Sequence, residues 1–202
     1  MTAPAAEWGA ATMPRDGESV AGDRYLVHED AEGLLIAAVD GVGHGREAAT
    51  AAEAAIHVFE SEPNRSLSRL LERCHVALQG TRGAVVLLAR YDSRRSRLEW
   101  AGVGPILGIV SRHDAARRPR NELLLTRTGM LGHGTLWAPA ASTAISAGDM
   151  LVLTTDGVSS GFLESLSPSD SPARLARHIL ESHRKTDDDA MVLVVRFRSS
   201  DG

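Results

Sequence analysis

The order of apolar and polar positions predicts a chain in which strands come in runs and helices lie between the runs. Apolar segments of strand length cover residues 18–28, 34–39, 83–91, 98–102, 106–111, 122–126, 143–147, 150–155 and 190–197. Apolar positions repeat with helical spacing over residues 46–60, 67–79 and 172–184. Because many strands follow one another directly, the pattern favours an α+β fold with antiparallel sheets over a doubly wound parallel fold.

The length and composition indicate a single domain. The chain has 202 residues, of which 43% are hydrophobic, and this is enough to build one sizeable core. Residues 1–16 are rich in Ala and Pro, and we expect them to be loose. We expect residues 17–198 to form one domain, because no linker-like stretch divides them.

Charge and cysteine content argue against several classes of protein. The net charge is −4 and the pI is about 6.1, whereas proteins that bind nucleic acid or anionic membranes present a basic surface. No apolar run approaches the roughly 18 residues that a membrane-spanning helix needs. The single cysteine, Cys74, allows no intrachain disulfide, which is typical of a reducing compartment. We therefore expect a cytoplasmic protein that binds neither nucleic acid nor membrane.

The sequence Asp-Gly-Val-x-x-Gly occurs twice, at residues 40–45 and 156–161, each time after an apolar strand. A third acidic stretch, 187–189, precedes the last strand, and Asp23 lies within the first strand pattern. If these strands are neighbours, their carboxylates converge at one sheet edge, where they repel unless they are protonated or neutralised by a cation. An all-oxygen cluster suits Mg²⁺ or Mn²⁺. On spacing alone, the alternative of turn-forming aspartates that accept backbone hydrogen bonds stays open.

Other glycine-rich and metal motifs do not match the chain. A dinucleotide-binding fingerprint that begins at Gly41 requires a glycine where Arg46 stands, and a P-loop requires a Gly-Lys pair that the chain lacks. Ser159 and Ser160 do not stand in a Gly-x-Ser-x-Gly frame, as a nucleophile elbow requires. The absence of a Cys and His ligand set argues against zinc.

Four stretches of the chain resemble, in the same order, the motifs of the PPM-type (type 2C) metal-dependent Ser/Thr protein phosphatases. These stretches are GESVAGDRYLV, AAVDGVGHG, LVLTTDGV and DDDAMVLVV. The bacterial SpoIIE-like branch is the most similar, and the resemblance covers roughly residues 16–197. It implies an αββα sandwich of two antiparallel sheets between helix pairs. It also implies a site for two Mn²⁺ or Mg²⁺ ions at one end of the sandwich.

The resemblance also implies a ligand set. Asp40 would bridge the two ions, and the Gly41 carbonyl would help to hold one of them. Asp156 and Asp188 would bind the other ion. We place the ligand at Asp188 because the residues that follow it then match the family's Asp-Asp-x-Thr-apolar pattern, although Met191 stands in place of the Thr.

Three further residues have less direct roles when the chain is compared with this family. Asp23 would act on the metal site directly or through water, and Asp189 would orient the site or hold a further, weaker ion. In eukaryotic relatives a His directly after Asp-Gly is the usual proton donor, but Val42 stands there in this chain. His44 follows two residues later, and it is a candidate general acid or else a loop residue.

The chemistry implied by the resemblance is hydrolysis of phosphoserine or phosphothreonine by a metal-bound water that Asp40, Asp156 and Asp188 hold in place through the ions. The stressosome phosphatases are the most similar subgroup, which implies phosphorylated STAS-domain proteins of a stressosome as partners in stress signalling. Two alternatives stay open. One is a phosphatase of an anti-anti-sigma factor, and the other is a non-catalytic protein that binds a phosphoprotein.

Overall fold

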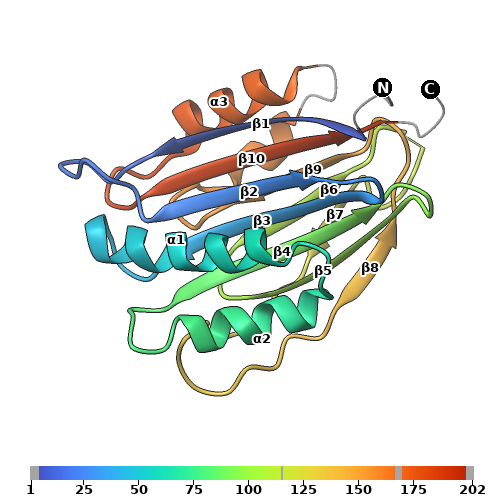
Figure 1. Ribbon diagram of the computed structural model, residues 1–202. Helices are drawn as coiled ribbons and strands as arrows, with labels where there is room; N and C mark the ends of the chain where they lie inside the picture. The colour runs from blue at the N-terminus through green and yellow to red at the C-terminus, as the bar shows by residue number, and fades with distance from the viewer. Residues whose placement is uncertain (1–4, 115, 167–169, 199–202) are drawn as a thin grey trace.

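The computed structural model describes residues 5–114, 116–166 and 170–198, which form two five-stranded antiparallel sheets stacked face to face (Figure 1). Sheet A has the order β1 (Ala6–Met13), β10 (Ala190–Phe197), β9 (Met150–Thr154), β6 (Leu107–Ser111) and β7 (Asn121–Leu124). Sheet B has the order β2 (Asp23–Glu29), β3 (Gly33–Gly41), β4 (Ala84–Asp92), β5 (Arg97–Val103) and β8 (Ala141–Ala144). The predicted α+β class with two antiparallel sheets is confirmed.

Helices cover the outer face of each sheet, which completes an αββα sandwich. Helices α1 (Gly45–Ser61) and α2 (Leu67–Ala77) pack on sheet B, and α3 (Pro172–His183) packs on sheet A (Figure 1). The resemblance led us to expect a helix pair on both faces. Within the described residues, however, sheet A is covered by α3 together with the short 3-10 helix η1 (Ser160–Ser165).

The core has three layers, because the central strands are buried on both faces. In β3, Leu34, Ile36 and Ala38 point into the space between the sheets, while Leu35 and Ala37 point toward α1 and α2. A strand that is covered on both sides needs apolar residues at successive positions. This explains why residues 34–39 form an unbroken apolar run instead of an alternating one.

The N-terminal segment corrects the expectation that residues 1–16 are loose. Residues 6–13 form β1, which pairs with β10 along its whole length, from Ala6 opposite Phe197 to Met13 opposite Ala190. The small residues that suggested looseness are required by packing. A Cβ added to Gly9 would lie 2.3 Å from the Cα of Ala173, so α3 contacts the β1 backbone directly. Residues 1–4 lie outside the described residues.

Other predicted boundaries need smaller corrections. The first strand was placed over 18–28, but β2 begins at Asp23, so that residues 18–22 form a loop. The strand placed over 143–147 lies at 141–144, and η1 was not predicted. The three α-helices lie within two residues of the predicted ranges. No helix among the described residues is long and apolar enough to cross a membrane.

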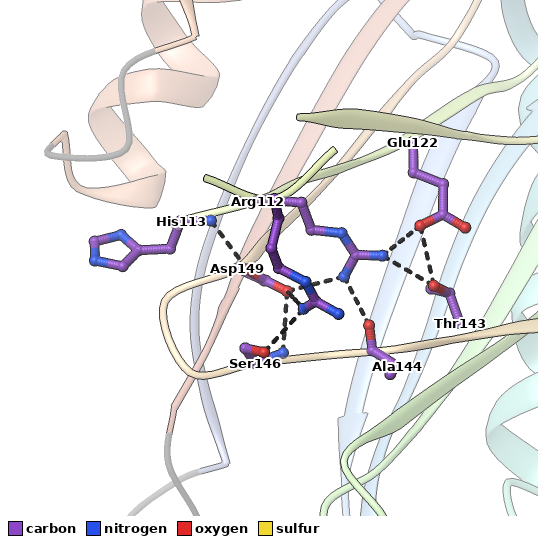
Figure 2. A network of polar contacts seen from close by, with 8 residues as sticks. Arg112, His113, Glu122, Thr143, Ala144, Ser146 and Asp149 are labelled. Atoms are coloured by element: carbon purple, nitrogen blue, oxygen red, sulfur yellow. Dashed lines mark hydrogen bonds and ion pairs between the residues drawn. The ribbon is translucent and has the colours of Figure 1, made fainter. Parts of the chain in front are cut away.

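A buried polar network ties the two sheets together at the end of the sandwich where β9 begins (Figure 2). Arg112 is 5% exposed, and Asp149 is fully buried. The Arg112 guanidinium donates to the Asp149 carboxylate at 2.9 Å, and its other nitrogen contacts Glu122 of β7 and Thr143 of β8. Since β8 belongs to sheet B and the acidic partners belong to sheet A, these bonds fix the sheets relative to each other.

Candidate active site

Four acidic segments meet at the opposite end of the sandwich, where β9 ends. Asp23 and Asp40 face each other in the β2–β3 ladder of sheet B. Asp156 lies two residues after β9, and Asp188 lies two residues before β10, which is the neighbour of β9 in sheet A. The carboxylates therefore converge across the gap between the two sheets. We expected them along one sheet edge, but each sheet contributes half of them.

Asp23 is the first residue of β2, and its side chain is almost completely buried. It is 2% exposed, and its Oδ2 accepts a hydrogen bond of 2.8 Å from the hydroxyl of Thr155, which connects the two sheets. Its Oδ1 has no hydrogen-bond partner among the described residues. Burial raises the pKa of Asp23 to about 7; the Thr155 bond opposes this rise, and the nearby acids of sheet A add to it.

The pKa of Asp40 is also raised, and by more than that of Asp23. Burial, and to a smaller extent the charges of Asp23, Asp156, Asp188 and Asp189, raise the pKa of Asp40 to about 8. Mutual destabilisation of this kind requires the carboxylates to lie close together. Asp23, Asp156, Asp188 and Asp189 therefore lie near enough to Asp40 to influence its pKa.

Asp188 and Asp189 differ in their contacts. Asp189 is 3% exposed, and its two oxygens accept hydrogen bonds from the backbone N–H groups of Arg15 at 2.8 Å and Gly22 at 2.7 Å. The Asp188 Oδ1 accepts the backbone N–H of Asp189, while its Oδ2 has no hydrogen bond to any described residue. Burial raises the pKa of Asp188. Asp189 thus anchors the loop that leads into β2, and Asp188 keeps one oxygen for another ligand.

The two Asp-Gly pairs allow backbone segments to approach each other closely. A Cβ on Gly41 would lie 2.0 Å from the carbonyl oxygen of Ala48, and one on Gly157 would lie 1.9 Å from that of Asp189. Gly41 is the last residue of β3, and the turn follows it. The turn uses Gly43 and Gly45, whose φ values are +94° and +71°.

His44 lies at the start of α1 and pairs with an acid that the sequence reading missed. Its Nδ1 lies 2.8 Å from the Oε1 of Glu18, and 46% of its side chain is exposed. Glu18 stands in the loop that Asp189 anchors, so only the tertiary structure brings it to His44. The sequence reading also missed Lys185, the only lysine of the chain. Its Nζ donates a hydrogen bond of 2.7 Å to the backbone carbonyl oxygen of Asp156, one of the acidic residues of the site.

The donor set has the chemistry of a site for hard divalent cations. All the converging groups are oxygens, they repel one another, and one of them, Asp23 Oδ1, is buried without a partner. As they stand, no three His, Cys, Asp or Glu side chains in the described part of the chain could hold an ion. Like charges that lie this near repel one another, and a bound cation would offset that repulsion.

Comparison with known proteins identifies the family of the chain. The profile of the family described as Stage II sporulation protein E (SpoIIE) matches residues 30–198, which include Asp40, Asp156 and Asp188. The chain belongs to the SpoIIE family of PP2C-type Ser/Thr phosphatases.

Individual relatives match to different extents. A solved structure described as "The bacterial stressosome: a modular system that has been adapted to control secondary messenger signaling" is 34% identical, covers 95% of this chain and 99% of that chain, and has a TM-score of 0.87. The crystal structure of RsbX in complex with magnesium is 18% identical, covers 93% of each chain, and agrees in fold with a TM-score of 0.82.

A curated relative matches over a shorter stretch. Phosphoserine phosphatase RsbX of Bacillus subtilis (strain 168) is 25% identical over 98 residues, which are 48% of this chain and 49% of the relative. The match thus spans about half the length of that relative.

Proposed function

We propose that this chain is a metal-dependent phosphatase that removes phosphate from phosphoserine or phosphothreonine on STAS-domain proteins of a stressosome. The convergence of the carboxylates around Asp40 is the observation that supports the hydrolysis. The partner class is supported by two similarities, one to the structure described as part of the bacterial stressosome and one to a phosphoserine phosphatase.

Two Mn²⁺ or Mg²⁺ ions would be held by Asp40, Asp156, Asp188 and the carbonyl of Gly41, with Asp23 in direct or water-mediated contact. Such ions activate a water molecule and offset the charge of the phosphoryl oxygens. Asp23 Oδ1, which has no hydrogen-bond partner within the described part of the chain, provides an oxygen for this purpose, and so does the Asp188 carboxylate. Asp189 acts as a positioning residue, because both of its oxygens already bind the backbone of the 15–22 loop.

The remaining residues orient the acids and handle the leaving group. Thr155 accepts the backbone N–H of Met191 at 2.9 Å and donates to Asp23, so its hydroxyl fixes the Asp23 carboxylate. In the reaction, the oxygen of a water molecule bonds to phosphorus, the bond from phosphorus to the Ser or Thr oxygen breaks, and that oxygen takes up a proton while inorganic phosphate is released. His44, held by Glu18 at the start of α1, is the candidate donor of this proton.

Hydrolysis of p-nitrophenyl phosphate and of a phosphorylated STAS-domain protein tests the proposal. We expect activity with Mn²⁺, loss of activity with EDTA, and a loss of at least about 100-fold in Asp40→Asn, because this change weakens the hold on the ions that offset the phosphoryl charge. Asp114→Asn is the matched control, since Asp114 is exposed on the loop after β6.

Two outcomes would count against this function. Activity that survives both EDTA and Asp40→Asn contradicts metal-dependent hydrolysis, and a wild type that binds phosphoproteins without hydrolysing them supports the binding-protein alternative. A higher rate on an anti-anti-sigma phosphoprotein than on a stressosome scaffold protein would reassign the partner.

A further inference from the structure

The loop that joins β7 to β8, residues 125–140, is fastened beside the acidic site. Leu131 exchanges two backbone hydrogen bonds, of 2.8 and 3.2 Å, with Ala84, and Ala84 lies opposite Gly41 in the β3–β4 ladder. Arg127 donates its N–H to the Gly102 carbonyl at 2.9 Å and accepts the N–H of Gly104 at 2.8 Å. The loop therefore has a fixed course along the end of sheet B that carries Asp40.

This loop exposes large apolar side chains that a lone globular domain would normally cover. Trp137 is 65% exposed, Leu125 is 78% exposed and Met130 is 37% exposed. Aromatic and methionine side chains of this kind are enriched where proteins bind one another. An apolar surface next to a catalytic site, rather than scattered single residues, indicates a binding role.

Three open hollows follow the loop and share lining residues. The first, of about 510 Å³, lies between residues 126–130 and Val85, which is opposite Asp40 in the ladder. The second, of about 430 Å³, shares residues 127–130 with the first and extends to Trp137. The third, of about 230 Å³, shares Trp137 and lies against α2. Because neighbouring hollows share lining residues, they form a groove along the loop from Val85 to α2.

The charge of this surface is opposite to that of the site. No acidic residue occurs between Glu122 and Asp149, although the chain contains 26 Asp and Glu residues. The only Arg or Lys in this stretch is Arg127, whose guanidinium lies 4.4 Å from the centre of the Trp137 ring. Glu72 of α2 also lines the third hollow, where it pairs with Arg69 at 2.9 Å. The loop side of the groove thus suits a partner that presents apolar side chains and negative charge.

We propose that the groove along residues 125–140, with Trp137 at its centre, is the docking surface for the phosphoprotein substrate. The proposal rests on the proposed function, because a protein that brings a phosphoserine to Asp40 must cover the surface next to it. Contacts at Trp137 would let the enzyme distinguish its protein partner from other phosphate esters. A buried tryptophan is among the residues that contribute most to binding affinity at interfaces.

The test compares Trp137→Ala with Trp8→Ala, in which a tryptophan that is 44% exposed on β1 is replaced in the same way. Calorimetry in EDTA, which prevents turnover, measures the Kd for a phosphorylated STAS-domain protein. Steady-state kinetics then give kcat/KM on that protein relative to kcat/KM on p-nitrophenyl phosphate. For Trp137→Ala we expect the Kd to rise at least about tenfold, and the ratio of the two kcat/KM values to fall by a similar factor. For Trp8→Ala we expect the Kd and this ratio to stay within twofold of wild type.

The outcomes separate this proposal from the proposed function. A Kd for Trp137→Ala within twofold of wild type, or an equal loss on both substrates, overturns the docking surface. A change of oligomeric state in sedimentation without a change in Kd also overturns it and assigns the groove to a second copy of the chain. An inactive wild type contradicts the hydrolysis, while the calorimetric comparison still reports on docking.

Discussion

At the scale of single residues, the buried carboxylates of the acidic site lower the free energy of unfolding near neutral pH. Burial raises the pKa of Asp23 to about 7 and that of Asp40 to about 8, both from an ordinary value of 3.8. The folded protein therefore holds more protons at these carboxyls than the unfolded chain does between about pH 4 and pH 8. The free energy of unfolding must fall as the pH rises through this range. The residues that support function thus reduce stability near neutral pH.

This pH dependence can be measured on the metal-free protein. With EDTA present, we expect the free energy of unfolding to decrease between pH 5.5 and 8, and Asp40→Asn to reduce that decrease by on the order of 1–2 kcal/mol, because Asn does not titrate. Urea titrations at several pH values provide the measurement. Parallel pH profiles for wild type and Asp40→Asn would show that Asp40 has an ordinary pKa in the folded state.

At the scale of elements, the fold depends on small residues where two backbones meet. Gly9 contacts α3, Gly41 contacts α1, and Gly157 contacts the segment before β10. In each case a Cβ would overlap a backbone atom at 2.3 Å or less. These contacts place the beginnings of α1 and β10 against the strand ends that carry the acids. The close packing of elements is therefore what brings the carboxylates together.

A substitution at Gly9 tests the position of β1 under α3. Gly9→Ala should lower the free energy of unfolding by about 3 kcal/mol, since the new methyl group meets the backbone of Ala173 and the overlap forces a shift. The control is Gly17→Ala, where φ is +90° and no atom lies within 4 Å, so that about 1–2 kcal/mol of backbone strain remains. Equal losses in thermal or urea unfolding would mean that β1 is not packed as described.

At the scale of the whole molecule, the two ends of the sandwich have different roles. The end with Asp40 gathers like charges, whereas the other end pairs its buried charges fully. There Arg112 bonds Asp149 and Glu122 and also donates to the Ala144 carbonyl at 2.7 Å (Figure 2). A buried pair of this kind adds little net stability, but it strongly penalises the loss of one partner. The end with Arg112 thus fixes the two sheets relative to each other, and it lies opposite the end that carries the acidic site.

Removal of Arg112 tests this division. Arg112→Met should cost about 3–5 kcal/mol, because buried Asp149 loses its hydrogen-bonded cation and keeps only the partly exposed Arg117, at 3.8 Å. Arg95→Met is the control, since Arg95 pairs with Asp92 at the surface and 81% of its side chain is exposed, so that the loss should stay below about 1 kcal/mol. We expect the folded Arg112→Met protein to keep its activity on p-nitrophenyl phosphate at 25 °C. A selective loss of that activity would show that the two ends are coupled.

Much of the fold could be predicted from local pattern. Residues 34–39 and 190–197 are apolar because their strands are covered on both faces, and the helical spacing of apolar positions located all three α-helices. The N-terminal strand could not be predicted, because its Ala and Gly residues have little intrinsic preference for a strand. The contact between Gly9 and Ala173, which spans most of the chain, decides its conformation.

The sequence by itself determined which side chains could form the acidic site, since Asp40 and Asp156 each follow an apolar strand and are each followed by glycine. It did not determine how they meet. Only the tertiary structure showed that the acids come from both sheets, that Asp189 binds the backbone of residues 15 and 22, and that Glu18 reaches His44. The physical reason is range: strand and turn preferences act between neighbours in the chain, whereas these contacts join segments that only the packing of two sheets brings together.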